Sequence, residues 1–261
     1  MDTKLYLGDC LKLMSNIEDS SIDLILCDLP YGTTQCDFDK IIPFAPLWEH
    51  YKRIIKNNGA IVLTAQSPFD KLLACSNLDM LRYEWIWEKT AATGHLNAKK
   101  MPLKAHENIL VFSELEHEHL LVFYKNLPIY RPQKTSGHKP VNSYTKHKSD
   151  GLNYGQTKTG ISGGGSTERY PRSVIRIPTD KQKSALHPQQ KPVALMEYLI
   201  NTYTNKGDIV LDNCMGSGTT GVACLQTKRK FIGIEKDPKY FEIAQKRLTN
   251  EISKLKADLF Y

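Results

Sequence analysis

Residues 209–221 read IVLDNCMGSGTTG, an apolar run that ends in an acid and leads into a glycine-rich turn. The apolar run predicts a buried strand over Asp208–Asp212, and the residues after the turn predict a helix over Ser217–Gln226. Glycine lets the backbone turn sharply and approach a ligand closely, which favours a binding site between the strand and the helix. This strand–turn–helix unit is typical of α/β folds.

The spacing Gly216-x-Gly218-x-x-Gly221 also fits a dinucleotide fingerprint, and Glu235 ends the next predicted strand 19 positions after Gly216. A carboxylate at that place can accept hydrogen bonds from both hydroxyls of a ribose. The turn therefore predicts an adenosine-containing cofactor, for which NAD and S-adenosylmethionine are the alternatives. Asp212, just before the turn, would repel a pyrophosphate but suits a sulfonium and an ammonium group. The acid therefore favours S-adenosylmethionine.

Strands and helices alternate along the chain on both sides of a long polar segment. Further strands are expected at Ser21–Asp28, Ala60–Thr64, Arg82–Glu88, Ile109–Phe112, Ser173–Ile177 and Lys230–Ile234, and further helices at 44–56, 191–202 and 238–256. The helix that starts at Phe44 is expected to end at Asn57-Asn58-Gly59. This alternation predicts an α/β fold around a mostly parallel sheet.

The net charge of +7 comes entirely from one segment. Between Lys125 and Lys183 there are 12 Lys and Arg residues but only 3 Asp and Glu residues, so this segment carries +9 and the rest carries −2. A basic segment rich in glycine is either a solvated loop or a surface for a polyanion such as nucleic acid. We expect a catalytic and cofactor-binding domain over 1–115 and 180–261, and an inserted basic region over 116–179.

Other features of the 261-residue chain narrow the class of protein. No run of 18 apolar residues and no secretory signal is found, so a membrane protein is not expected. The six cysteines are scattered without metal-site spacing, which predicts free thiols in a reduced, cytoplasmic compartment and no metal site.

The segment Asp28-Leu29-Pro30-Tyr31 follows the first predicted strand and suits methylation of an amino group. The amino nitrogen of adenine or cytosine is a poor nucleophile, because its lone pair is delocalised into the ring. Two acceptors, the Asp28 carboxylate and the Leu29 carbonyl, would localise that lone pair and stabilise the charge that develops on nitrogen. Pro30 restricts the backbone of Leu29, and Tyr31 can stack on a base that has left the duplex. By itself, a pattern of four residues is also compatible with an ordinary turn.

Together these segments resemble the amino-methylating DNA methyltransferases, whose catalytic motif is Asp/Asn/Ser-Pro-Pro-Tyr and whose cofactor motif is Asp-x-Phe-x-Gly-Ser-Gly-Thr. The first corresponds to residues 28–31 and the second to residues 212–219. The catalytic motif comes first and the basic insertion lies between the two, which resembles the beta-class, circularly permuted order. The resemblance implies a Rossmann-like methyltransferase fold with a mostly parallel seven-stranded sheet and one antiparallel strand.

Further segments extend the resemblance to nearly the whole chain outside about 115–180. Residues 187–193 resemble a family segment that contacts the methionine end of the cofactor, and residues 8–11 resemble one near its adenine. Residues 105–112 resemble a family strand. The cofactor-binding residues expected from the turn and the resemblance are Asp9, Cys10, His187, Gln190, Lys191, Pro192, Asp212, Cys214, Gly216, Ser217, Gly218, Thr219 and Glu235.

The resemblance also implies double-stranded DNA as the partner, held by the basic insertion. Lys and Arg neutralise phosphates, and Arg also reads guanine edges. The candidate DNA-binding residues are Lys134, Lys139, Lys146, Lys148, Lys158, Arg169 and Arg172. A homodimer, and a cognate restriction endonuclease on another chain, are expectations from the family alone.

Several functions remain open at this point. N6 of adenine is favoured over N4 of cytosine because Asp at the first motif position is commoner in the adenine enzymes. Leu29 replaces the usual proline and Cys214 replaces the usual phenylalanine, so a DNA-binding relative without activity is an alternative. A nicotinamide-dependent oxidoreductase would leave Asp28–Tyr31 and the basic insertion unexplained.

Overall fold

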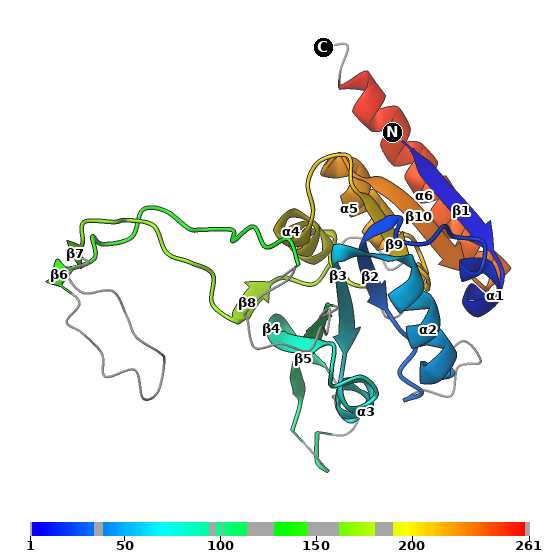
Figure 1. The fold of residues 1–261 in the computed structure, drawn as a ribbon, viewed down its shortest axis with the longest axis horizontal. Helices are drawn as coiled ribbons and strands as arrows, with labels where there is room; N and C mark the ends of the chain where they lie inside the picture. The colour runs from blue at the N-terminus through cyan, green and yellow to red at the C-terminus, as the bar shows by residue number, and fades with distance from the viewer. Residues whose placement is uncertain are drawn as a thin grey trace, which may run out of the picture. The chain divides into compact units, whose positions relative to one another are not determined.

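The computed structural model describes residues 2–33, 39–93, 98–100, 102–113, 128–145, 162–180 and 190–258. Contacts divide the chain into two compact units, one of residues 1–131 and 173–261 and the other of residues 132–172. The first unit contains all the strands of the large sheet and all the helices of the described residues (Figure 1).

The large sheet has eight strands in the order β1-β10-β9-β2-β3-β5-β4-β8. Their bounds are β1 Thr3–Leu7, β2 Ile22–Asp28, β3 Ile55–Ala65, β4 Leu81–Thr93, β5 Lys104–Phe112, β8 Val174–Ile177, β9 Ile209–Asp212 and β10 Lys230–Glu235. Strand β5 runs antiparallel to β3 and β4, and every other pairing in this sheet is parallel. The expected mostly parallel sheet with one antiparallel strand is confirmed. The sheet has one strand more than the expected seven, since the short β8 extends the edge at β4.

Helices cover both faces of this sheet (Figure 1). Their bounds are α1 Cys10–Met14, α2 Phe44–Ile54, α3 Phe69–Cys75, α4 Val193–Tyr203, α5 Thr219–Gln226 and α6 Pro238–Ala257. Side chains of a strand alternate between its two faces. In β2, Leu24 and Leu26 therefore pack with α4, α5 and α6, whereas Ile25 and Cys27 pack with α1, α2 and α3. All four side chains are buried, which explains why this run is apolar without interruption.

Two parts of the main unit differ from the sequence prediction. Helix α2 ends at Ile54, and Asn57-Asn58-Gly59 lies inside β3. The pairing of β2 with β3 shifts between Ile22 and Leu24, so several residues of β3 bulge out there and both asparagines are exposed. Strand β1, which was not predicted, pairs in parallel with β10 at the edge of the sheet.

The second unit, residues 132–172, contains a small antiparallel pair of strands, β6 Tyr144–Thr145 and β7 Ser162–Gly163. An isolated bridge between Thr135 and Arg169 joins its two ends. Its sequence contains seven Lys and Arg residues against two Asp and Glu residues. The unit lies within the predicted insertion, whose bounds at 116 and 179 stay a prediction.

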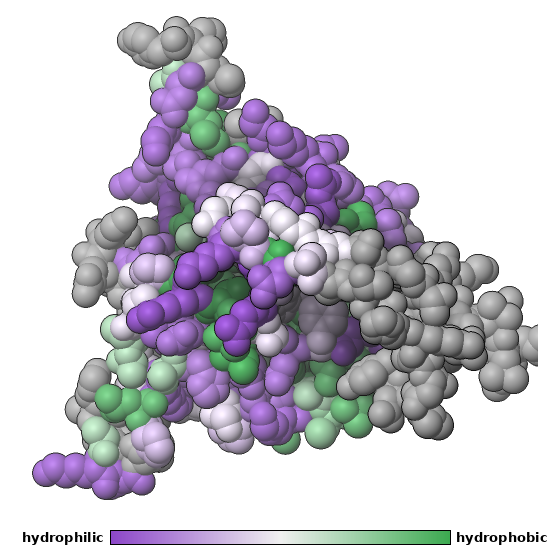
Figure 2. Space-filling model, turned by 90° about the vertical axis from the view of Figure 1, so that its left-hand side faces the viewer, coloured by the Kyte–Doolittle hydropathy of each residue, from purple (hydrophilic) through white to green (hydrophobic). Residues whose placement is uncertain are grey.

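The described residues visible in Figure 2 are mostly hydrophilic, and hydrophobic residues form small separate patches among them. Among the described residues, we find no helix with the length and apolar character needed to cross a membrane.

A valine at Gly221 should destabilise the fold. A Cβ atom at Gly221 in α5 would lie 2.7 Å from Phe231 of β10 and 2.8 Å from Leu248 of α6. Overpacking of this kind costs about 1–3 kcal/mol. We expect Gly221→Val to lower the free energy of unfolding in urea by at least that amount. Ser253→Val, on the exposed side of α6, is the matched control and should change it by less than about 0.5 kcal/mol. Equal stability of the two variants would contradict the close packing of α5.

Candidate active site

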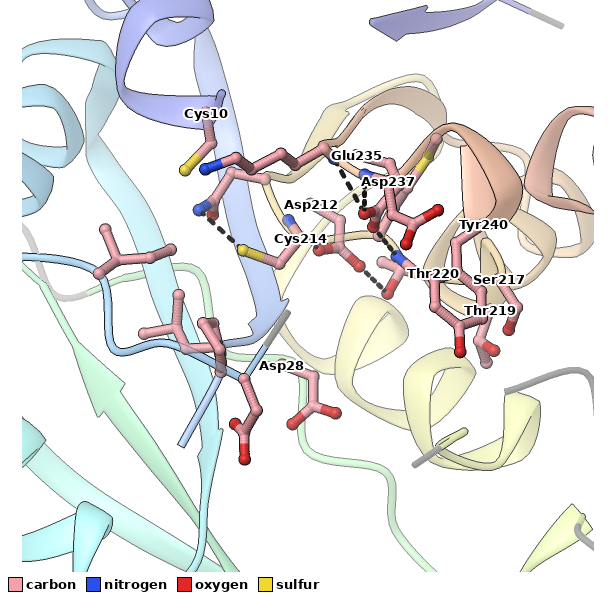
Figure 3. A pocket seen from close by; sticks show the side chains of 18 of the residues that line it. Cys10, Asp28, Asp212, Cys214, Ser217, Thr219, Thr220, Glu235, Asp237 and Tyr240 are labelled. Carbon is pink, nitrogen blue, oxygen red and sulfur yellow. Dashed lines mark hydrogen bonds between the residues drawn. The ribbon is translucent and has the colours of Figure 1, made fainter. Parts of the chain in front are cut away.

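One cavity of about 550 Å³ lies at the carboxyl ends of the central parallel strands. Strands β2, β9 and β10 end there in Asp28, Asp212 and Glu235, and all three carboxylates line the cavity (Figure 3). Ligands of open α/β sheets bind in this position, because neighbouring parallel strands deliver their last residues to the same edge.

The glycine-rich turn forms one wall of the cavity. Gly218 has a φ of +79°, a left-handed conformation that favours glycine, and a Cβ atom there would lie 3.1 Å from Ala244 of α6. The Gly216 amide donates to Glu235 Oε2 at 2.9 Å, and the amides of Lys236 and Asp237 donate to Oε1. These bonds fix the carboxylate of Glu235 at the cavity, and burial raises its pKa although the three amides oppose that shift.

Asp212 lies deeper in the same wall, with only 3% of its surface exposed. Its carboxylate accepts a hydrogen bond from Thr220 Oγ1 at 2.6 Å and one from the Cys214 amide at 3.1 Å (Figure 3). Burial raises the pKa of Asp212 to about 6 despite these donors. Nearby, Gln190 Oε1 is buried at the cavity without a hydrogen-bond partner among the described residues. A buried anion and an unsatisfied acceptor fit a ligand that carries positive groups.

Asp28 is the centre of the other half of the cavity. Its Oδ1 accepts hydrogen bonds from the Tyr31 hydroxyl, at 2.6 Å, and from the Thr64 hydroxyl. Its Oδ2 accepts from Lys191 Nζ at 2.6 Å. An ionised carboxylate has about four acceptor positions, so one position on Oδ2 is left for a substrate.

Lys191 is almost completely buried and interacts with two acids. Besides its bond to Asp28, its ammonium lies 3.3 Å from Glu107 Oε2. Burial acts to lower the pKa of Lys191, but the two carboxylates outweigh this effect, and the pKa is raised above its ordinary value. The predicted contact of Lys191 with the methionine end of a cofactor therefore stays a prediction, and in this structure the ammonium is paired within the protein.

The hydroxyl of Tyr31 contacts Asp28, and the face of its ring is covered by other side chains. The ring stacks on Phe69 with centroids 5.1 Å apart, Lys191 Nζ lies 5.5 Å from the ring centroid, and only 8% of the residue is exposed. The loop after Pro30 is held by Asp39, whose two carboxylate oxygens accept from the amides of Gly32 and Thr33 at 2.9 Å each. The predicted stacking of Tyr31 on a base stays a prediction.

The structure brings most of the predicted site residues to this one cavity. The predicted residues that line it are Asp9, Cys10, Asp28, Leu29, Pro30, Gln190, Lys191, Asp212, Cys214, Gly216, Ser217, Thr219 and Glu235. Gly218 and Pro192 are the residues directly before α5 and α4 and are not part of the lining. His187 lies outside the described residues.

The described DNA-binding candidates within residues 132–172 differ in whether their side chains are bonded within the protein or exposed. The Arg169 guanidinium donates to the backbone carbonyls of Lys139, Ser166 and Glu168, so this side chain supports the unit itself. Lys134 pairs with Glu168 at 3.0 Å. Lys139 and Arg172 are exposed. The other three candidates, Lys146, Lys148 and Lys158, lie outside the described residues.

The sequence reasoning missed several residues that contact the predicted ones. Thr64 and Asp39 hold Asp28 and the loop that follows it, and Glu107 holds Lys191. Thr64 ends a predicted strand next to the strand of Asp28, so the order of the strands would have indicated it. Glu107 lies on the antiparallel strand, whose neighbours the sequence does not give.

Comparison with known proteins agrees with this geometry. A family model described as DNA methylase, N6_N4_Mtase, matches residues 22–246. Type II methyltransferase M.HpaI of Haemophilus parainfluenzae is 31% identical over 268 residues, which cover 97% of this chain and 76% of that protein. DNA adenine methyltransferase YhdJ of Escherichia coli (strain K12) is 29% identical over 92% of this chain and 81% of its own length.

Among solved structures, a crystal structure described as an M1.HpyAVI-SAM complex is similar, with a TM-score of 0.61 and 25% identity, and covers 94% of this chain and 98% of its own. The PvuII cytosine-N4-specific DNA methyltransferase shares the fold, with a TM-score of 0.67 at 16% identity. The family match spans both the Asp28 half and the Asp212 half of the cavity, and this chain therefore belongs to the N6_N4_Mtase family of DNA methylases.

Proposed function

We propose that this protein methylates N6 of adenine at specific sites in double-stranded DNA. The observation that carries the proposal is the common cavity, in which Asp28 at the end of β2 faces the same space as Asp212 and Glu235. Membership of the DNA methylase family supplies the reaction class, and the YhdJ relative is an adenine methyltransferase by its name.

The methyl donor is S-adenosylmethionine, in agreement with the family and with the cofactor in the M1.HpyAVI complex. When bound, it supplies an electrophilic methyl group on a positively charged sulfur. Asp212 and Gln190 Oε1 suit its positive groups, and Glu235 suits its ribose hydroxyls. The chain also contains the glycine spacing of a dinucleotide site, but the buried anion at Asp212 would repel a pyrophosphate.

The residues at Asp28 then act on the target base. The base leaves the duplex to reach the cavity. Asp28 Oδ2 and the Leu29 carbonyl accept the two amino hydrogens, which localises the lone pair and stabilises the charge that develops on nitrogen. The Tyr31 and Thr64 hydroxyls hold Oδ1 and so orient the carboxylate. Bound S-adenosylmethionine would supply the methyl group to this nitrogen as its carbon–sulfur bond breaks and a neutral thioether leaves, and the proton would then pass to solvent.

The same geometry would accept the N4 amino group of cytosine, which is the second candidate. The PvuII enzyme, which shares the fold, is cytosine-specific. The replacements at Leu29 and Cys214 motivate a third candidate, a DNA-binding protein without activity. However, a leucine retains the backbone carbonyl that the reaction needs, and both residues line the cavity.

Methyl transfer from labelled S-adenosylmethionine to unmethylated DNA of mixed sequence tests this proposal. Nucleoside analysis of the product should find the label in N6-methyladenine. Asp28→Ala should lower the rate at least about 100-fold, because it removes a preorganised acceptor. The control Asp79→Ala removes an exposed carboxylate outside the cavity and should keep the rate. Label in N4-methylcytosine would refute the choice of base, and no label in the presence of bound cofactor and DNA would favour the inactive relative.

Cofactor affinity should depend on pH through Asp212. Its pKa of about 6 means that the anion that attracts the positive ligand is present above pH 6 and is lost below it. We expect calorimetry to show affinity for S-adenosylmethionine falling about tenfold from pH 7 to pH 5. Asp212→Asn should bind more weakly at pH 7 and lose most of this dependence. A variant that keeps the full dependence would assign it to another group.

The salt dependence of DNA binding tests the basic unit. Each phosphate contact adds about 0.9 to the slope of log affinity against log salt. Lys139→Ala and Arg172→Ala should each lower that slope by about this amount, since both side chains are exposed in the basic unit. Lys254→Ala, an exposed lysine on α6, is the control. If the slope of log affinity against log salt is the same in Lys139→Ala and Arg172→Ala as in Lys254→Ala, these two side chains do not contact phosphates.

A further inference from the structure

Four buried or half-buried charges alternate in sign behind the cavity. Lys89 Nζ lies 2.6 Å from Glu107 Oε1, Glu107 Oε2 lies 3.3 Å from Lys191 Nζ, and Lys191 Nζ lies 2.6 Å from Asp28 Oδ2. The side chains of Lys89, Glu107 and Lys191 are 6–8% exposed, and that of Asp28 is 23% exposed. We call these four residues the charge row. Its sum is zero.

Packing alone does not require this arrangement. Moving one ion from water into a protein interior costs several kcal/mol, and a buried pair often contributes nothing net to stability. Glu107 and Lys89 lie on the paired strands β5 and β4, and apolar residues in place of a buried ion pair often leave stability unchanged or raise it. Lys89 is also supported by Trp87, whose ring centroid lies 5.4 Å from the ammonium. We therefore expect the charge row to act on Asp28, the one acid of the row that lines the cavity.

The charge row influences how well Asp28 can accept a hydrogen bond from the amino group. An ammonium 2.6 Å from Oδ2 opposes the positive charge that develops on the amino nitrogen beside the same oxygen. Glu107 shares that ammonium and reduces its effect on Asp28, and Lys89 in turn limits the negative charge of Glu107. Lys191 can thus hold the carboxylate in place without removing its ability to accept a hydrogen bond.

We propose that Glu107 and Lys89 are positioning residues for methyl transfer, which act through Lys191 to set the strength of Asp28 as an acceptor. This inference rests on the proposed function, because it assumes that Asp28 receives the amino group. It concerns two residues that do not line the cavity.

Two single variants should move the pH–rate profile in opposite directions. Glu107→Gln removes the negative charge that shares the Lys191 ammonium with Asp28, so we expect the acidic limb of kcat to move to lower pH. Lys89→Met removes a positive charge, so this limb moves to higher pH. We expect a shift of about one unit for Glu107→Gln and a smaller shift for Lys89→Met, because Lys89 is one ion pair further from Asp28. The plateau kcat of Glu107→Gln should fall about tenfold, with the KM for DNA and for the cofactor little changed.

Two comparisons separate this effect from a loss of structure. Lys56→Gln breaks a 2.6 Å ion pair with Asp23 at the opposite end of β2, and it should leave the profile of the wild type. The double variant Glu107→Gln/Lys89→Met restores the zero sum, and its acidic limb should lie between those of the wild type and Glu107→Gln. If Glu107→Gln does not fold, Lys89→Met and the double variant still give the direction of the shift.

Opposite shifts of the acidic limb in the two single variants would support the proposal that Glu107 and Lys89 act on Asp28 through Lys191. Shifts in the same direction, or no shift, in variants that bind cofactor as the wild type does would refute it and leave the proposed function intact. A wild-type product of N4-methylcytosine would refute the choice of adenine but keep this test, since the same carboxylate would accept that amino group. A wild type that methylates neither base would refute both proposals.

Discussion

The parallel pairing of β2 with β9 is the constraint on which the site depends. Leu24 and Ile25 of β2 pair with Val210 and Leu211 of β9, although about 185 residues of chain separate them. Because the two strands are parallel, both end at the same edge of the sheet, and each ends in an aspartate. The pairing therefore places Asp28, the proposed acceptor of the amino group, and Asp212, the proposed anion of the cofactor site, beside one cavity. The apolar residues that bury both faces of β2 hold this arrangement.

The two aspartates differ in their surroundings, and the difference matches their proposed roles. Asp212 is buried among hydroxyl and amide donors, and its pKa is raised to about 6. Burial disfavours the ionised form of Asp212, and a positively charged ligand would stabilise that form. Asp28 is more open and is held by two hydroxyls and an ammonium, so that its carboxylate is oriented before a base arrives. In the proposed roles, one sheet edge thus combines an electrostatic site for a cation with a preorganised acceptor.

Local patterns predicted most of the strands and the residues on both sides of the cavity, because an apolar run that ends in an acid or a glycine turn depends on few residues. The helix end at Asn57-Asn58-Gly59 was wrong, since the same residues suit a bulge in β3 and only the pairing with β2 decides between the two. Glu107 and Lys89 were not predicted as site residues. Their role depends on β4 lying beside the antiparallel β5, with Lys191 about 85 positions further along the chain. Spacing in the sequence contains no trace of such a contact.

A crystal structure of the protein with S-adenosylmethionine and duplex DNA would test whether one cavity holds both the cofactor and the target amino group. We expect an adenine outside the duplex, with its amino nitrogen about 3 Å from Asp28 Oδ2 and from the Leu29 carbonyl, and the cofactor methyl group directed at that nitrogen. A cofactor bound beside Asp212 with the base held elsewhere, away from Asp28, would contradict it.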